Sequence, residues 1–165
     1  MAEKYEFCSA GPAFPGKSHA PPGKDRDHIV PWAIIQHVLN KIDPTEKNDD
    51  MRDEIKKIFN DPLKNMQHLT RYENGDLKSR LVTHLLTPGN NYFKVNQRDL
   101  SEFQSNSTQL NSQICKLLKE MVDKWNELKK ELTNNYFLGE FKQQLDSILN
   151  ENNVRNRFPN IFSTL

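Results

Sequence analysis

The sequence is poor in cysteine, has no long apolar run and carries almost no net charge. Its two cysteines, Cys8 and Cys115, lie far apart and form no Cys-x-x-Cys pair, which excludes a structural zinc site built on cysteine thiolates. No apolar run approaches the length of a membrane span, and the first residues, Met1-Ala2-Glu3-Lys4, lack the hydrophobic stretch of a secretory signal. We therefore expect a soluble chain without a classical signal peptide.

Charge and hydropathy limit the class further. The formal net charge is +1, so no global basic field points to nucleic acid as a partner, although a local basic patch would suffice to bind it. Hydrophobic residues make up 35% and charged residues 27% of the 165-residue chain, and the mean hydropathy is -0.83. These values predict one domain with a modest core and a strongly hydrated surface.

Proline and glycine are concentrated near the N-terminus, in the strings Gly11-Pro12, Pro15-Gly16 and Pro21-Pro22-Gly23. Such dipeptides favour turns and extended backbone over regular structure. We therefore expect residues 1–25 to form a flexible arm and residues 26–165 to form a single domain.

Apolar residues recur at steps of three and four in much of the remaining chain, which predicts a mainly helical fold. This spacing predicts one helix over Trp32–Ile42 and a second over Asp50–Phe59. Asp43-Pro44 and Asp61-Pro62 end these helices, because the residue before a proline is biased away from helical backbone.

The middle of the chain is harder to assign. Residues 63–76 are ambiguous, although Asn74-Gly75 within them predicts a turn. Leu77–Leu86 fits a short helix or a strand. Pro88 fits the first turn of a further helix that would run through Phe93 and Val95.

The C-terminal helices, at residues 107–150, have the clearest pattern. An apolar stripe from Leu110 to Leu132 predicts one long helix, and the spacing from Phe141 to Leu149 predicts another after a Thr-Asn-Asn break. We expect the two to pair as a long antiparallel hairpin.

The string Asp25-Arg26-Asp27-His28-Ile29-Val30-Pro31 is the most informative part of the sequence. We expect a short strand at Ile29-Val30, with Asp27 and His28 beside it. A carboxylate can hold a hard cation, and a neighbouring neutral imidazole can deprotonate water. Together they form the minimum apparatus for metal-assisted hydrolysis of a phosphodiester.

This string, followed later by His84-Leu85-Leu86-Thr87-Pro88-Gly89-Asn90-Asn91, resembles the HNH family of ββα-metal nucleases, including nuclease domains of bacterial polymorphic toxins. The resemblance implies that Asp27 binds the metal and that His28 is the catalytic base. It also implies that Asn91, or otherwise Asn90, closes the metal shell. His84 lies where the family has a structural asparagine that ties the two strands together.

The resemblance covers only these two short strings of the 165-residue chain. They lie farther apart than in a compact HNH core, so a helical insertion at residues 43–80 would separate the two halves of the motif. The expected fold class is therefore mainly α, with a small ββα-metal core and the C-terminal hairpin. Because Mg²⁺ prefers oxygen ligands and keeps several waters, one carboxylate and one amide oxygen would suffice to hold it.

Basic residues lie close to both strings in the sequence. Lys24 and Arg26 precede His28, while Lys94 and Arg98 follow Asn91. Arginine and lysine side chains near a cleavage site contact the flanking phosphates of a nucleic acid. We expect these four residues to bind nucleic acid if the fold brings them together, with Arg26 the foremost because it adjoins Asp27.

The leading hypothesis is a metal-dependent endonuclease that hydrolyses phosphodiester bonds, with DNA favoured over RNA. The resemblance implies a bacterial toxin or effector domain that acts in the cytoplasm, is delivered by a specialised secretion system and has a cognate immunity protein. The first alternative is a non-enzymatic helical interaction module in which the Asp27-His28 string is accidental. A second alternative is a metal-dependent hydrolase that acts on something other than nucleic acid.

Overall fold

The computed structural model describes residues 23–88 and 108–158, which form a mainly helical fold with a small sheet. The first part of the chain contains two strands and several helices, and the second part contains helices alone. In chain order the elements are β1 (Lys24–His28), α2 (Trp32–Ile42), α3 (Asp49–Phe59), α4 (Pro62–Asn65), β2 (Met66–Thr70), η1 (Tyr72–Lys78), α5 (Ser79–Leu86), α8 (Thr108–Leu128), η2 (Lys129–Glu131), α9 (Tyr136–Ile148) and α10 (Glu151–Arg157).

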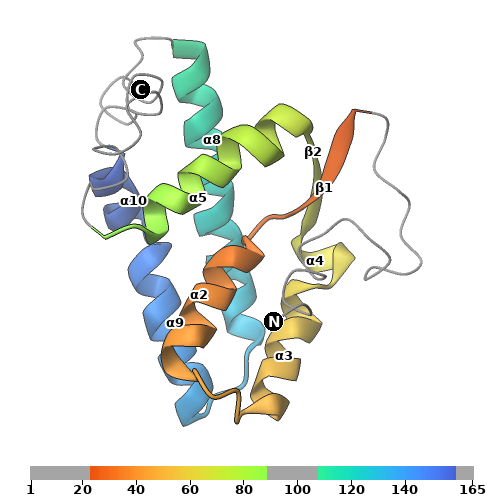
Figure 1. Cartoon of the computed structure of the whole chain (residues 1–165), viewed down its shortest axis with the longest axis vertical. Coiled ribbons are helices and arrows are strands. Elements are labelled where there is room, and N and C mark those ends of the chain that lie inside the picture. The colour runs from red at the N-terminus through yellow and green to blue at the C-terminus, as the bar shows by residue number, and fades with distance from the viewer. Residues whose placement is uncertain (1–22, 89–107, 159–165) are drawn as a thin grey trace.

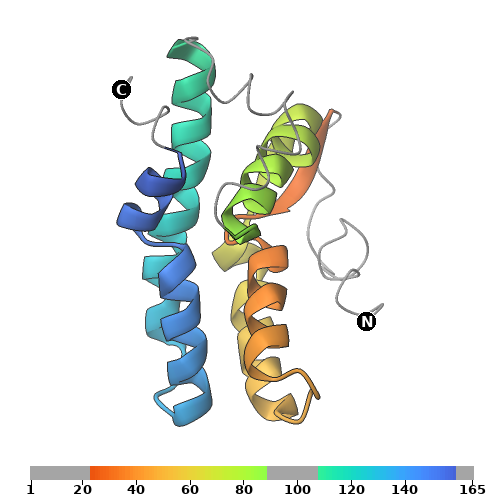
Figure 2. The same ribbon diagram turned by 60° about the vertical axis from the view of Figure 1, so that its left-hand side comes forward.

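The elements lie in two layers. One layer holds α8, α9 and α10, and the other holds α2, α3, α5 and the two strands (Figures 1 and 2). The predicted C-terminal hairpin is confirmed, since α8 and α9 run antiparallel and Trp125 Nε1 of α8 donates a 2.7 Å hydrogen bond to Asp146 of α9. The short helix α10 follows this hairpin and was not predicted. The helix predicted after Pro88 lies outside the described residues.

Three aromatic side chains join the two layers. Phe59 of α3 stacks on Trp125 of α8 with ring centroids 6.0 Å apart, and Phe141 of α9 meets both rings edge-on. All three side chains are fully buried. Such pairs add to the stabilisation that burial of apolar area provides, so this cluster fixes α3 against the C-terminal hairpin.

Helices α2 and α3 lie where the apolar spacing predicts them, within one residue. A buried ion pair closes the turn between them, because Arg52 Nε donates to Asp43 Oδ2 at 2.8 Å. Burial raises the pKa of Asp43, but hydrogen bonds from Arg52, Asn48 and the Lys47 backbone outweigh it and lower this pKa to about 2. The Asp43 carboxylate therefore holds the turn between α2 and α3 in place by accepting hydrogen bonds from several residues along it.

The sheet consists of β1 and β2, which pair antiparallel with Asp27 opposite Gln67 and His28 opposite Met66. The predicted strand at Ile29-Val30 is wrong by a few residues, since the strand ends at His28. Because β1 begins at Lys24, the predicted arm of residues 1–25 overlaps the strand by two residues, Lys24 and Asp25. β2 lies within the stretch that the sequence left ambiguous.

A continuous helical segment follows β2 and packs against the sheet. Its first part, η1, is a π-helix that contains Asn74 and Gly75, so the turn predicted there is wrong. Its second part, α5, decides the ambiguity of Leu77–Leu86 in favour of helix. Three helices, α2, α3 and α4, lie between the two strands, and the expected insertion at residues 43–80 contains α3, α4, β2 and η1.

Within residues 23–88 and 108–158, no helix combines the length and the apolar character that crossing a membrane requires.

Replacing Asp43 by Asn should destabilise the fold, because it leaves the buried Arg52 guanidinium without its carboxylate. The expected loss is roughly 3–5 kcal/mol in the free energy of unfolding, measured by urea denaturation at pH 7. The stabilisation from this ion pair is fully present above pH 3.8, the ordinary pKa of Asp43, and is lost as the pH falls toward about 2. The exposed Asp53→Asn in α3 is the matched control. Equal stability of both variants would contradict the role assigned to Asp43.

Candidate active site

A pocket with a cavity volume of about 370 Å³ lies beside the end of β1, where the strand meets η1 and α5. Its polar lining residues include Arg26, Asp27, His28, Asn74 and Lys78. The structure therefore brings the two principal residues predicted from the sequence, Asp27 and His28, to the same pocket. Side chains alternate along a strand, so Asp27 and His28 face different neighbours there.

Asp27 is buried and faces the helix that follows β2. Its Oδ2 accepts a 2.5 Å hydrogen bond from Lys78 Nζ and a 3.0 Å hydrogen bond from Gln67 Nε2. The Lys78 ammonium also donates to the backbone oxygens of His28, at 2.8 Å, and Ile29, at 3.1 Å. Burial lowers the pKa of Lys78, whereas the Asp27 carboxylate opposes this change by favouring the charged ammonium.

His28 is buried on the other side of the strand, against the end of α3. Its Nε2 lies 2.8 Å from Asn60 Oδ1, and its ring lies 6.1 Å from the Trp32 ring, measured between centroids. Burial lowers the pKa of His28 from 6.5, although the hydrogen bond with Asn60 and the charge of Asp27 act in the opposite direction. The imidazole is therefore neutral at physiological pH. Because a carboxamide oxygen only accepts, the Nε2 atom carries the proton and Nδ1 is the basic nitrogen.

Asn65 ties the chain after β1 to the end of α3. Its Oδ1 accepts from Val30 N at 2.8 Å, and its Nδ2 donates to Val30 O at 3.2 Å and to Phe59 O at 2.9 Å. The resemblance implies that His84 ties the two strands together, but the side chain bonded beside the strands is that of Asn65, which directly precedes β2. His84 instead lies at the end of α5, where its Nε2 contacts Arg157 O at 2.7 Å and its ring meets Phe158 edge-on.

The described residues fit a divalent ion at Asp27 poorly. They contain no group of three or more His, Cys, Asp or Glu side chains with the geometry of a metal site. One oxygen of Asp27 already accepts from a buried ammonium, and a divalent ion about 4 Å from an ammonium is repelled by about 8 kcal/mol at an effective dielectric constant of about 20. Asn90 and Asn91, the other expected ligands, lie outside the described residues, so Mg²⁺ binding stays a prediction.

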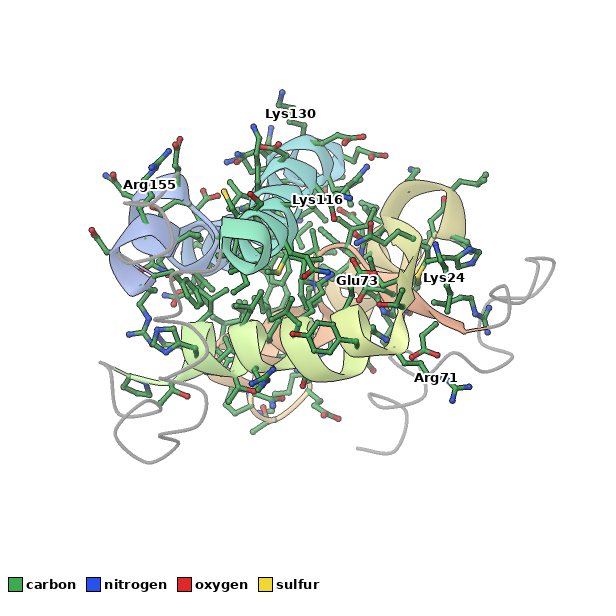
Figure 3. The ribbon with its side chains drawn as sticks, turned by 90° about the horizontal axis from the view of Figure 1, so that it is seen from above. Lys24, Arg71, Glu73, Lys116, Lys130 and Arg155 are labelled. Atoms are coloured by element: carbon green, nitrogen blue, oxygen red, sulfur yellow. The ribbon has the colours of Figure 1, made fainter. Side chains whose placement is uncertain are left out.

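Among the predicted basic residues, Arg26 lines the pocket and Lys24 lies on the same strand. Arg71, which follows β2, lies on this side of the molecule as well, 3.8 Å from Asp25, whereas Lys130 and Arg155 lie on the side of the C-terminal layer (Figure 3). Lys94 and Arg98 lie outside the described residues.

Four residues of the site were not predicted from the sequence: Asn60, Asn65, Gln67 and Lys78. Asn60 and Asn65 bracket the Asp61-Pro62 helix break, a place where polar side chains commonly bond to the backbone. Gln67 stands across the sheet from Asp27, and its role becomes visible only once the strand register is known. No sequence pattern near Lys78 indicates that it pairs with Asp27, which lies 51 residues away in the chain.

Comparison of the chain with models of known protein families, with curated proteins and with solved structures found no match. The function is therefore inferred from the geometry of the site.

Replacing Asn65 by Ala should destabilise the protein by roughly 2–4 kcal/mol, because three buried backbone groups lose their hydrogen-bond partner. The measurement is the free energy of unfolding in urea, and the exposed Asn152→Ala in α10 serves as the control. A variant as stable as the control would show that Asn65 does not hold the chain after β1 in place.

Proposed function

We propose that this protein hydrolyses phosphodiester bonds of nucleic acid, with DNA favoured, and that His28 is the general base. The support comes from a neutral imidazole at a pocket, with one nitrogen held by Asn60 and with Arg26 beside it. The antiparallel pair of strands beside Asp27 and His28 fits the two strands of the ββα arrangement that the resemblance to HNH nucleases implies, and the helix that this resemblance assigns to Asn90 and Asn91 lies outside the described residues.

His28 has the protonation state that a base needs. Its lowered pKa keeps the ring neutral at physiological pH, and the hydrogen bond from Nε2 to Asn60 leaves Nδ1 as the basic atom. A base that is neutral at the working pH contributes roughly a hundred- to ten-thousandfold to the rate. Asn60 holds the ring in one orientation and one tautomer, so that the basic nitrogen is fixed before substrate binds.

The chemistry requires one bond to form and one to break at phosphorus. His28 takes a proton from water as the water oxygen bonds to phosphorus, and the bond from phosphorus to the 3′-oxygen breaks. The proton then passes to the leaving oxygen, and the products are a 5′-phosphate and a 3′-hydroxyl. Negative charge builds up on the non-bridging oxygens, where a guanidinium such as that of Arg26 stabilises it.

Arg26 is the described basic residue best placed for this role, since it lies on the same face of β1 as His28 and lines the same pocket. Lys24 and Arg71 lie on the same side of the molecule, with Arg71 3.8 Å from Asp25, and would contact the flanking phosphates. A toxin role, delivery by a secretion system and a cognate immunity protein stay predictions from the resemblance.

The first test is cleavage of plasmid DNA and of single-stranded RNA by the full chain, with Mg²⁺ and separately with EDTA. His28→Ala should lower the rate of cleavage roughly a hundred- to ten-thousandfold, because it removes the base. The control is His37→Ala, which removes an exposed histidine from α2 and should leave the rate unchanged.

Two outcomes would contradict the proposal. Equal rates for the wild type and His28→Ala would remove His28 from catalysis. Intact DNA and RNA under every condition would favour the non-enzymatic helical interaction module instead, or a hydrolase with another substrate.

The second test is the pH dependence of kcat/KM, which reports the pKa of the free base. Activity should fall on the acid side with a midpoint below pH 6.5, because burial lowers the pKa of His28. Asn60→Leu should move this midpoint to lower pH, since the contact with Asn60 raises the pKa. Asn60→Asp should move it to higher pH, since a carboxylate favours the charged imidazolium.

The exposed Asn152→Leu provides the control for this profile and should leave it unchanged. Shifts of both Asn60 variants in the same direction would show that Asn60 acts on folding rather than on the imidazole.

A further inference from the structure

The Lys78 ammonium occupies a site made entirely of oxygen atoms. Its three acceptors are Asp27 Oδ2 at 2.5 Å, His28 O at 2.8 Å and Ile29 O at 3.1 Å. An ammonium has three N–H donors, so each donor has an acceptor here. The Lys78 and Asp27 side chains are only 4% and 8% exposed.

We propose that Lys78 is the permanent cation of this pocket and that it excludes a divalent ion from Asp27. One carboxylate oxygen and two backbone carbonyls are the kinds of ligand that Mg²⁺ and Ca²⁺ take in proteins. The protein fills this oxygen site with a side chain from the end of η1 instead of a metal ion. The consequence for catalysis, that cleavage needs no metal at Asp27, rests on the proposed function, whereas the metal-binding statement does not.

The burial of the pair keeps the ammonium in place. If Lys78 moved out to solvent, Asp27 would keep only Gln67 as its partner in the described structure, and the oxygens of His28 and Ile29 would lose the ammonium. Leaving a buried charge unpaired is strongly unfavourable. A metal ion would therefore have to displace an ammonium that three oxygen atoms hold.

Lys78 also fixes the backbone on both sides of the His28–Ile29 peptide bond. It therefore acts as a positioning residue for His28, because it holds the main chain from which the imidazole projects.

The test is a titration of the full chain with Mn²⁺, followed by electron paramagnetic resonance of the free ion. The wild type and Asp27→Asn should bind Mn²⁺ equally, because Asp27 is committed to Lys78. Lys78→Gln should gain one Mn²⁺ site that the wild type lacks, because the Asp27 carboxylate and the oxygens of His28 and Ile29 lose the ammonium. The double variant Lys78→Gln/Asp27→Asn should lose the gained site.

Lys57→Gln, at an exposed position of α3, is the control for the loss of one positive charge, and circular dichroism verifies folding of each variant. A folded Lys78→Gln that gains no site overturns the proposal. So does a wild type that binds one Mn²⁺ that Asp27→Asn loses, and this comparison decides the matter even if Lys78→Gln fails to fold.

Cleavage assays separate this inference from the proposed function. The rate in Mg²⁺ relative to that in EDTA should be the same for the wild type and for Asp27→Asn. A dependence of cleavage on Mg²⁺ that Asp27→Asn removes overturns the inference and leaves the proposed function intact. A protein that cleaves nothing overturns the proposed function, while the Mn²⁺ titration still decides the role of Lys78.

Discussion

The arrangement of the candidate site depends on the buried ion pair between Asp27 and Lys78. The pair joins the end of β1 to the helix that follows β2, and the other two hydrogen bonds of the ammonium hold the backbone of His28 and Ile29. Glu73 of η1 adds hydrogen bonds with Thr70 of β2, but the Asp27–Lys78 pair is the buried polar link from β1 itself to this helix. Removing one partner of such a pair is costly because the other charge stays buried. The position of His28 is therefore coupled to Lys78.

The helices could be predicted from the sequence because a helix that buries one face has apolar residues at steps of three and four. Helix α2 buries Trp32, Ile35 and Leu39 at steps of three and four. The long helix α8 likewise buries one face, which includes Trp125 of the aromatic cluster. Strand β2 has no apolar pattern that would predict it, since Leu69 is its one buried residue. Asn74-Gly75 misled the prediction because the pair lies inside a π-helix, where the chain continues as a helix instead of turning.

The site was predictable only where its residues are adjacent in sequence. Asp27 and His28 stand side by side, so their chemistry can be recognised before the fold is known. Their partners cannot, because Asn60 lies 32 residues from His28 and Lys78 lies 51 residues from Asp27. The resemblance implies a strand-tying role for His84, which lies at the end of α5 beside Phe158, whereas the hydrogen bonds next to the strands come from Asn65, which precedes β2 directly. A short motif shows which chemical groups are present, and the fold shows which partners each of these groups has.

The two adjacent residues are used in different ways. Asp27 points toward the helix, where its charge is balanced by Lys78, and it thus contributes to the structure of the corner. His28 points toward α3, where one nitrogen is bound by Asn60 and burial keeps the ring neutral. The charge of Asp27 is balanced by Lys78, whereas His28 is neutral, with a pKa that burial lowers and that the hydrogen bond with Asn60 and the charge of Asp27 act to raise. If the proposed function holds, the imidazole of His28 supplies the base and the permanently charged Arg26 guanidinium binds phosphate at the same pocket, while Asp27 serves the fold.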